Sequence, residues 1–156
     1  MAPGPTIKEM QRDTQIVRDG LSSLLLKCRR QDDGIAILYS FPSTFINKIE
    51  VGPSYYGKYE TRTGSGWEQH QAWFLALRAQ GLQFSYVTDR MLRRGEFRTR
   101  DYKVLILPQA EAIGPQEAEV IRAFVESGGT VIADVRPGIY DGHCKPLADG
   151  ILDDLF

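Results

Sequence analysis

The chain has 156 residues, of which 42% are apolar and 25% charged, and its formal net charge is −1. This length predicts one domain, long enough to bury a hydrophobic core. The balanced charge argues against nucleic acid or an anionic membrane as a partner, and no apolar run reaches the roughly 18 residues needed to cross a bilayer.

A long amphipathic helix is predicted over residues Thr6–Arg30. Its apolar residues alternate at spacings of three and four, which makes a narrow seam. The seam consists of Ile7, Met10, Thr14, Val17, Leu21, Leu24 and Cys28. Such a helix extends for roughly 36 Å, which is more than one flank of a small sheet needs. Two interpretations stay open: the helix lies on its own domain, or part of it docks onto another domain or subunit.

The segment Ile35–Ser40 is the first predicted strand, and a long connection follows it from Phe41 to Gly66. Connections of this length are usually functional or make contacts. Aromatic residues together with glycines suit a surface that recognises a sugar or a protein. The alternative is that the same side chains pack into a small core under the loop. The candidate contact residues of this loop are Phe45, Tyr55, Tyr56 and Tyr59.

Helices and strands alternate through the middle of the chain. A helix is predicted over Trp67–Gln80, a strand over Phe84–Thr88 and a short helical turn over Asp89–Glu96. His70 is interpreted as a structural histidine rather than a catalytic one. The arginines between residues 90 and 100 are interpreted as a solvated face, with a phosphate or anion site as the alternative.

Residues 101–135 predict a strand, a helix and a second strand. Val104–Leu107 is a continuous apolar run, typical of a strand covered on both faces. Gly114-Pro115 opens the helix and Gly128-Gly129 ends it, so Thr130–Val135 is the fourth strand. The whole pattern predicts an α/β fold with an open, mainly parallel, flavodoxin-like sheet of order 2-1-3-4 in three layers, preceded by the long N-terminal helix.

Ligands of open α/β sheets bind beyond the carboxyl ends of the strands. Glu111 and Asp134 follow two such ends and could form a carboxylate pair for acid–base chemistry. The alternative, which we favour, is that each carboxylate caps backbone donors of its own loop. The candidate pocket residues at these ends are Ser40, Asp89, Gln109, Glu111, Asp134 and Arg136.

A hydrolase or amidotransferase site in such a fold needs Cys or Ser on the sharp turn after the fourth strand. The sequence there is Val135-Arg136-Pro137-Gly138, and none of these side chains can attack a carbonyl carbon. His143 and Cys144 follow, but sequence neighbours rarely point at a common centre. Zinc-ligand spacing and glycine-rich nucleotide motifs are also missing from the sequence. We therefore expect no catalytic residue, metal or cofactor in this chain.

Four segments follow the predicted N-terminal helix in a characteristic order. They are DGIAILYS at 33–40, YKVLILP at 102–108, FVESGG at 124–129 and IYD at 139–141. This order resembles the middle domain of family 42 β-galactosidases, the trimerisation domain, which has the class I glutamine amidotransferase-like fold. The resemblance spans nearly the whole chain. The long tyrosine-rich connection departs from the family pattern.

The resemblance implies a non-catalytic accessory domain that mediates oligomer contacts, in a trimer, within an enzyme of carbohydrate metabolism. In such enzymes the catalytic glutamates lie on a TIM barrel that precedes this domain, so no catalytic residue carries over. The barrel is the implied partner. Residues 1–33 would be the connector helix and residues 34–156 the amidotransferase-like domain, both parts of a larger glycosidase.

Two other hypotheses stay open. An autonomous amidotransferase-like or ThuA-like protein with a sugar-related hydrolytic site would need Glu111, Asp134 and a histidine, His70 or His143, to converge. A flavodoxin-like protein could bind a flavin without a sequence motif. The sequence shows no secretory signal and no disulfide framework, which predicts a cytoplasmic protein, although a fragment of a secreted protein would look the same.

Overall fold

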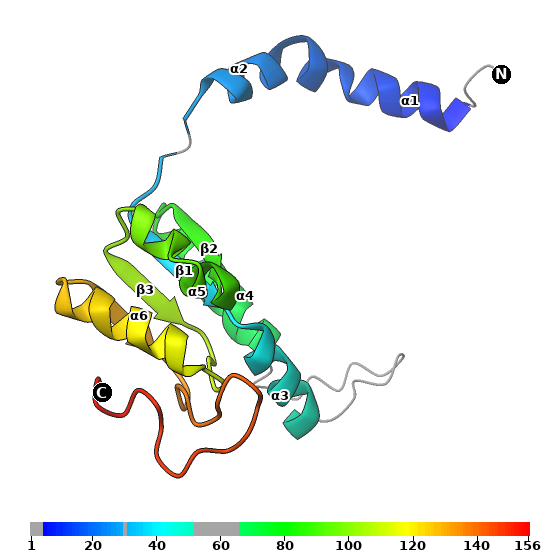
Figure 1. Cartoon of the computed structure of the whole chain (residues 1–156). Helices are drawn as coiled ribbons and strands as arrows, with labels where there is room; N and C mark the ends of the chain where they lie inside the picture. Colours follow the sequence, from blue (N-terminus) through cyan, green and yellow to red (C-terminus); the bar gives the residue numbers. More distant parts are fainter. Residues whose placement is uncertain (1–4, 30, 52–65) are drawn as a thin grey trace. The chain divides into compact units, whose positions relative to one another are not determined.

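The computed structural model describes residues 5–29, 31–51 and 66–156, and the chain divides into two units, residues 1–31 and 32–156. The first is called the helical unit here and the second the sheet unit. Figure 1 traces both along the chain.

The helical unit follows the helix that the sequence predicts, except that a π-helical segment interrupts it and its end comes earlier. It consists of α1 (Pro5–Asp13), the π-helix η1 (Val17–Leu21) and α2 (Ser22–Lys27). The Thr14 hydroxyl donates to the Met10 carbonyl over 2.7 Å, and Gly20 lies within the π-helix. Both features weaken a regular α-helical ladder. The helix also ends earlier than predicted, because Cys28 already has an extended backbone.

The sheet unit contains four parallel strands in the predicted order, β2-β1-β3-β4. The strands are β1 (Ile35–Tyr39), β2 (Phe84–Thr88), β3 (Val104–Leu107) and β4 (Thr130–Ala133). In register, Ile35 lies opposite Phe84 on one side and Val104 on the other. The prediction of an open, parallel α/β sheet is confirmed.

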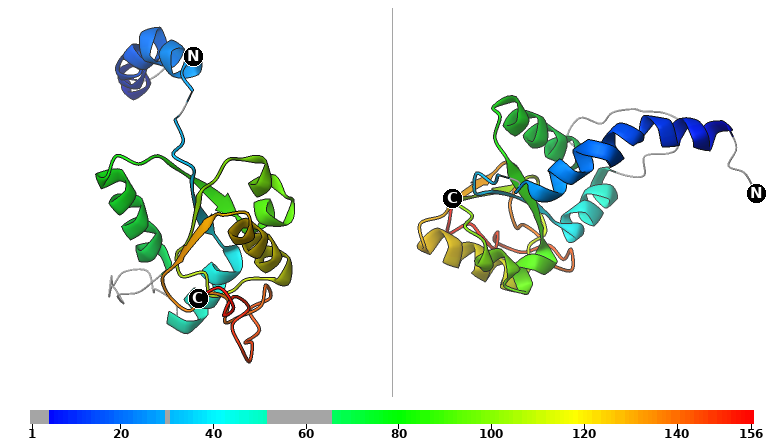
Figure 2. Two further views of the ribbon diagram at one scale, coloured as in Figure 1. Left: turned by 90° about the vertical axis from the view of Figure 1, so that its left-hand side faces the viewer. Right: turned by 90° about the horizontal axis from the view of Figure 1, so that it is seen from above.

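Helices cover both faces of this sheet, as Figure 2 shows. They are α3 (Phe41–Val51), α4 (Gly66–Ala79), α5 (Asp89–Arg93), the 3₁₀-helix η2 (Glu96–Thr99) and α6 (Pro115–Glu126). Successive strand residues point to opposite faces. Ile35 and Ile37 therefore pack with Leu77 of α4, whereas Ala36 and Leu38 belong to the core shared with α5 and α6.

The predicted loop from Phe41 to Gly66 is wrong for its first part, because α3 begins directly after β1. The sequence concealed this helix because Ser43 and Thr44 have modest helix propensity, whereas Pro42 in the first turn is compatible with a helix start. Long-range contacts override that preference: the buried Ser43 hydroxyl donates to the Ala112 carbonyl over 3.1 Å and accepts from the Ala112 amide over 3.0 Å. Phe45 thus lies on a helix. Tyr55, Tyr56 and Tyr59 lie outside the described residues.

The segment after β4 returns along the carboxyl end of β3. The Gly138 amide donates to the Ala110 carbonyl and the Tyr140 amide to the Glu111 carbonyl, both over 2.9 Å. Leu152, further along, is fully buried in the core beneath α6. This return brings residues 134–140 against the loop that follows β3.

Candidate functional site

The six candidate pocket residues follow the strands as predicted, and the structure distributes them over four groups of contacts. Glu111 is bonded to Arg136, and Asp134 to the backbone of Gln109. Ser40 and Asp89 each have partners of their own. The contacts of each group decide what chemistry it can support.

Glu111 is fully buried, and Arg136 is its counterion. Arg136 Nη2 donates to Glu111 Oε1 over 2.6 Å, and Asn47 Nδ2 donates to Glu111 Oε2 over 3.4 Å. The negative charge of Glu111 raises the pKa of Arg136 above its ordinary value. An isolated buried carboxylate is costly unless it is paired and hydrogen-bonded. This carboxylate therefore has the partners that a structural ion pair requires.

Glu50 extends the same network to the end of α3. Arg136 Nη2 lies 3.2 Å from Glu50 Oε2, and the Tyr140 hydroxyl donates to Glu50 Oε1. That hydrogen bond to a carboxylate raises the pKa of Tyr140. Arg136 thus joins α3 to the loop after β3, which fixes the end of the helix against the sheet.

Arg136 occupies the turn where a hydrolase of this fold would carry its nucleophile. Its φ angle is +40°, in the left-handed region that few non-glycine residues adopt. A strained turn at this place is the setting in which a serine or cysteine is presented to substrate. Here the turn presents a guanidinium, which cannot attack a carbonyl carbon.

Asp134 caps backbone donors, the arrangement favoured by the sequence for both carboxylates, whereas for Glu111 that expectation is wrong because its partners are the side chains of Arg136 and Asn47. Its Oδ1 accepts from the amides of Gln109 and Val135, both over 2.6 Å, and its Oδ2 accepts from Trp73 Nε1 over 3.2 Å. Gln109 has a φ of +42°, and the carboxylate satisfies its amide at this turn. Asp134 therefore ties the turn after β3 to the turn after β4 and to α4.

His70 lies among aromatic rings of β1 and β2. Its ring centroid is 5.3 Å from that of Tyr39 and 6.2 Å from that of Tyr86. Burial lowers the pKa of His70 below the ordinary value of 6.5, while the charge of Asp134 opposes this shift. Within the described residues, His70 Nδ1 is buried without a hydrogen-bond partner.

Ser40 and Asp89 support neighbouring helices. The Ser40 hydroxyl donates to the Ala112 carbonyl and accepts from the Ser43 amide, each over 3.2 Å. Asp89 accepts from Arg93 Nη2 over 2.9 Å, and Arg93 also pairs with the buried Glu117 of α6. Arg93, one of the clustered arginines, thus links α5 to α6.

The neighbours His143 and Cys144 take part in a local turn. The Asp141 carboxylate accepts from the amides of His143 and Lys145, over 2.8 and 2.9 Å, and these bonds lower the pKa of Asp141. The Cys144 thiol donates to the Pro42 carbonyl over 3.3 Å, and burial raises the pKa of Cys144. Both the bond to a carbonyl and the raised pKa disfavour the reactive thiolate.

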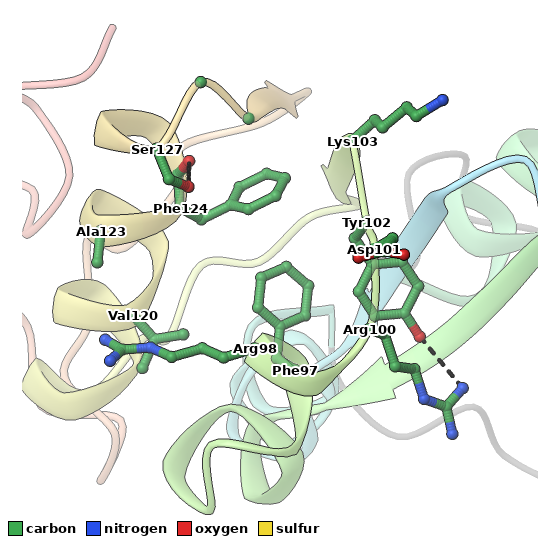
Figure 3. A pocket seen from close by; sticks show the side chains of 12 residues that line it. Phe97, Arg98, Arg100, Asp101, Tyr102, Lys103, Val120, Ala123, Phe124 and Ser127 are labelled. Atoms are coloured by element: carbon green, nitrogen blue, oxygen red, sulfur yellow. Dashed lines mark hydrogen bonds between the residues drawn. The ribbon is translucent and has the colours of Figure 1, made fainter.

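A hollow of about 540 Å³ lies at the other end of the sheet and includes none of the six candidates. Phe97 stacks on Tyr102 with ring centroids 5.1 Å apart, and Phe124 meets Phe97 edge-on at 5.1 Å. Figure 3 shows these rings at the centre, with Arg98 reaching towards α6 and Arg100 towards the Tyr102 hydroxyl. Two of the clustered arginines therefore line a surface hollow.

The sequence did not point to the residues of α3 that complete the network. Ser43, Asn47 and Glu50 recur at helical spacing and contact the loops that follow β3 and β4. Their period of three to four residues was a usable signal, but polar residues on the inner face of a helix do not stand out from a loop.

Neither a metal cluster nor a membrane-spanning helix is found in the described chain. Over residues 5–29, 31–51 and 66–156, no three His, Cys, Asp or Glu side chains are grouped so that they could hold a metal ion. In the same residues, no helix combines the length and the apolar character that a bilayer crossing requires.

Comparison with solved structures finds the same fold in parts of β-galactosidases. The chain superposes on a β-galactosidase from Bifidobacterium adolescentis with a TM-score of 0.58, at 18% identity over 80% of this chain and 53% of that one. For the β-galactosidase Gan42B from G. stearothermophilus, the TM-score is 0.66, at 20% identity over 94% of this chain and 20% of that one. For the β-galactosidase from Marinomonas ef1, the TM-score is 0.65, at 18% identity over 97% of this chain and 21% of that one. The chain thus spans about half of the first relative and about a fifth of the other two.

A search of the curated proteins finds no relative of this chain. The model of one protein family, described as the β-galactosidase trimerisation domain, matches residues 33–155. That match covers almost all of the sheet unit. The chain therefore belongs to the β-galactosidase trimerisation-domain family.

Proposed function

We propose that this chain is the assembly domain of a longer β-galactosidase-type glycoside hydrolase, acting in carbohydrate metabolism without catalysing the reaction itself. The family match supports the assembly role, and the small share of each relative that the chain spans supports a longer parent protein. The parent's TIM barrel would carry the catalytic glutamates and would be this domain's partner, with the helical unit as connector.

The observation that carries the proposal is the ion pair at the turn after β4. Arg136 stands where a nucleophile is required, and it is bonded to Glu111, the most deeply buried acid near the strand ends. A general acid or base must reach the proton that it transfers. Glu111 has no exposed surface, and Asp134 is bonded to two amides and an indole.

The experiment measures the mass and the activity of the purified chain. Light scattering over a range of concentrations should give a mass above that of the 17.6-kDa monomer, with three copies as the expected assembly. A chromogenic galactoside should not be hydrolysed by the same sample. A strict monomer at the highest concentration would refute the assembly role.

An autonomous hydrolase of the amidotransferase-like or ThuA-like kind predicts a different outcome. It requires turnover of a sugar-derived ester or amide that is abolished by Glu111→Gln and unaffected by a matched change at an exposed acid, Asp149→Asn. Turnover with that dependence would replace the assembly role by a catalytic one.

A further inference from the structure

Helix α3 presents three apolar side chains on its outer face. Phe41, Phe45 and Ile49 follow one another at intervals of four residues, and 51%, 60% and 72% of each remains exposed. Residues four apart lie above one another on a helix, so the three side chains form one stripe. Exposed apolar groups that are contiguous in this way mark interaction surfaces, whereas scattered ones are ordinary.

The inner face of the same helix holds the stripe in place. Ser43, Ile46 and Asn47 are buried, with exposed fractions of 5%, 7% and 6%. The end of the helix is fixed by Glu50, which forms an ion pair with Arg136 and accepts a hydrogen bond from the Tyr140 hydroxyl. A surface that is already ordered loses little conformational entropy when a partner binds. The stripe is therefore held in an ordered position that suits binding, while its own side chains take no part in packing α3 onto the sheet.

We propose that the stripe of Phe41, Phe45 and Ile49 is the apolar centre of the contact between copies of this chain. This rests on the assembly role proposed above. The occupant is a second copy because the family to which the chain belongs is described by its self-assembly. The net charge of −1 produces little repulsion between copies, and Glu50 beside the stripe is paired with Arg136, which it shares with Glu111.

The geometry of a three-membered ring adds a requirement. Each contact in such a ring is head-to-tail, so the stripe of one copy meets a different surface of the next. A stable interface buries roughly 800 Å² on each partner, which is more than three side chains supply. The stripe is accordingly the centre of a larger contact, where truncation of an aromatic side chain has its greatest effect.

The test compares two double variants that are matched in residue type and exposure. Phe45→Ser with Ile49→Ser removes the stripe. Phe156→Ser with Ile16→Ser removes a phenylalanine and an isoleucine that are 62% and 73% exposed elsewhere. Sedimentation velocity should show that the stripe variant needs an at least about tenfold higher concentration for half-assembly, while the control assembles as the wild type does. Circular dichroism melting verifies that both variants are folded.

The possible outcomes separate the two proposals. If the wild type is a monomer, the assembly role itself fails. If the wild type assembles and the stripe variant assembles equally well, the assembly role stands and the stripe is refuted. If assembly weakens equally in the stripe variant and the control, the role of the stripe is also refuted, because the effect would not be specific to α3. Hydrogen exchange of the wild type gives an independent reading: residues 41–51 should exchange more slowly as the concentration rises, because association suppresses local opening of α3, and an unchanged rate contradicts the proposal.

Discussion

Arg136 adopts a backbone conformation that costs energy for any residue except glycine, and its contacts explain why an arginine is kept there. From this turn its guanidinium reaches the buried Glu111 and the end of α3 together. The sequence predicted the absence of a nucleophile here, because that depends only on residue identity. It did not predict the pairing with Glu111, because residues 111 and 136 are brought together only by the return of the chain after β4.

Replacing Arg136 by methionine should destabilise the sheet unit strongly. The variant leaves Glu111 buried without its cation, which should lower the unfolding free energy. The half-exposure of Arg136 limits this decrease to about 3 kcal/mol at most. Urea unfolding followed by tryptophan fluorescence measures the change. The double variant Arg136→Met with Glu111→Gln should recover part of the loss, since no charge is then buried. An unchanged unfolding free energy in the single variant would show that the pair contributes nothing.

His70 should make stability depend on pH near neutrality. Burial lowers the pKa of His70 in the folded chain, so the unfolded chain binds this proton at a higher pH. Stability is then fully present above about pH 6.5 and decreases as the pH falls from there towards the lower folded pKa. Unfolding midpoints at pH 7.5 and 5.5 should differ more in the wild type than in His70→Gln. The same difference in both proteins would assign the effect to other groups.

At the scale of elements, strands were predictable and α3 was not. The runs at 35–39 and 104–107 are apolar and buried, and burial on both faces leaves a clear signal in the sequence. Helix α3 has an apolar outer stripe and a partly polar inner face, the reverse of the usual pattern. Its stability comes from Ser43 and Asn47 contacts with residues more than 60 positions away, which no local pattern contains.

The end of α6 should be sensitive to a single methyl group at Gly129. A Cβ there would overlap the ring of Phe124, which packs edge-on against Phe97. Gly129→Ala forces this ring to move and should cost about 1 to 3 kcal/mol in the unfolding free energy. Gly20→Ala is the control, because no atom lies within 4 Å of that position. It should raise helicity without changing the tryptophan-detected transition, and equal effects of the two substitutions would contradict the packing argument.

At the scale of the molecule, the core belongs to the sheet unit. Every residue of the two hydrophobic clusters lies between Ile35 and Leu155. A unit with its own core can fold by itself. The sequence predicted a leading helix and a following α/β domain from the change between helical and strand patterns. It did not predict what the apolar seam of the leading helix packs against, because that depends on the partner, which a single sequence does not identify.

A chain that begins at Asp32 should therefore unfold as cooperatively as the full chain. Both tryptophans, Trp67 and Trp73, belong to the sheet unit, so the shortened chain keeps both fluorophores. The unfolding free energy should agree with that of the full chain within about 0.5 kcal/mol, the usual range for changes away from the core. Far-ultraviolet circular dichroism should lose the contribution of α1 and α2. A broad transition, or a clearly lower midpoint in urea, would mean that the helical unit stabilises the sheet, and the connector role assigned to it would need to be replaced by a structural one.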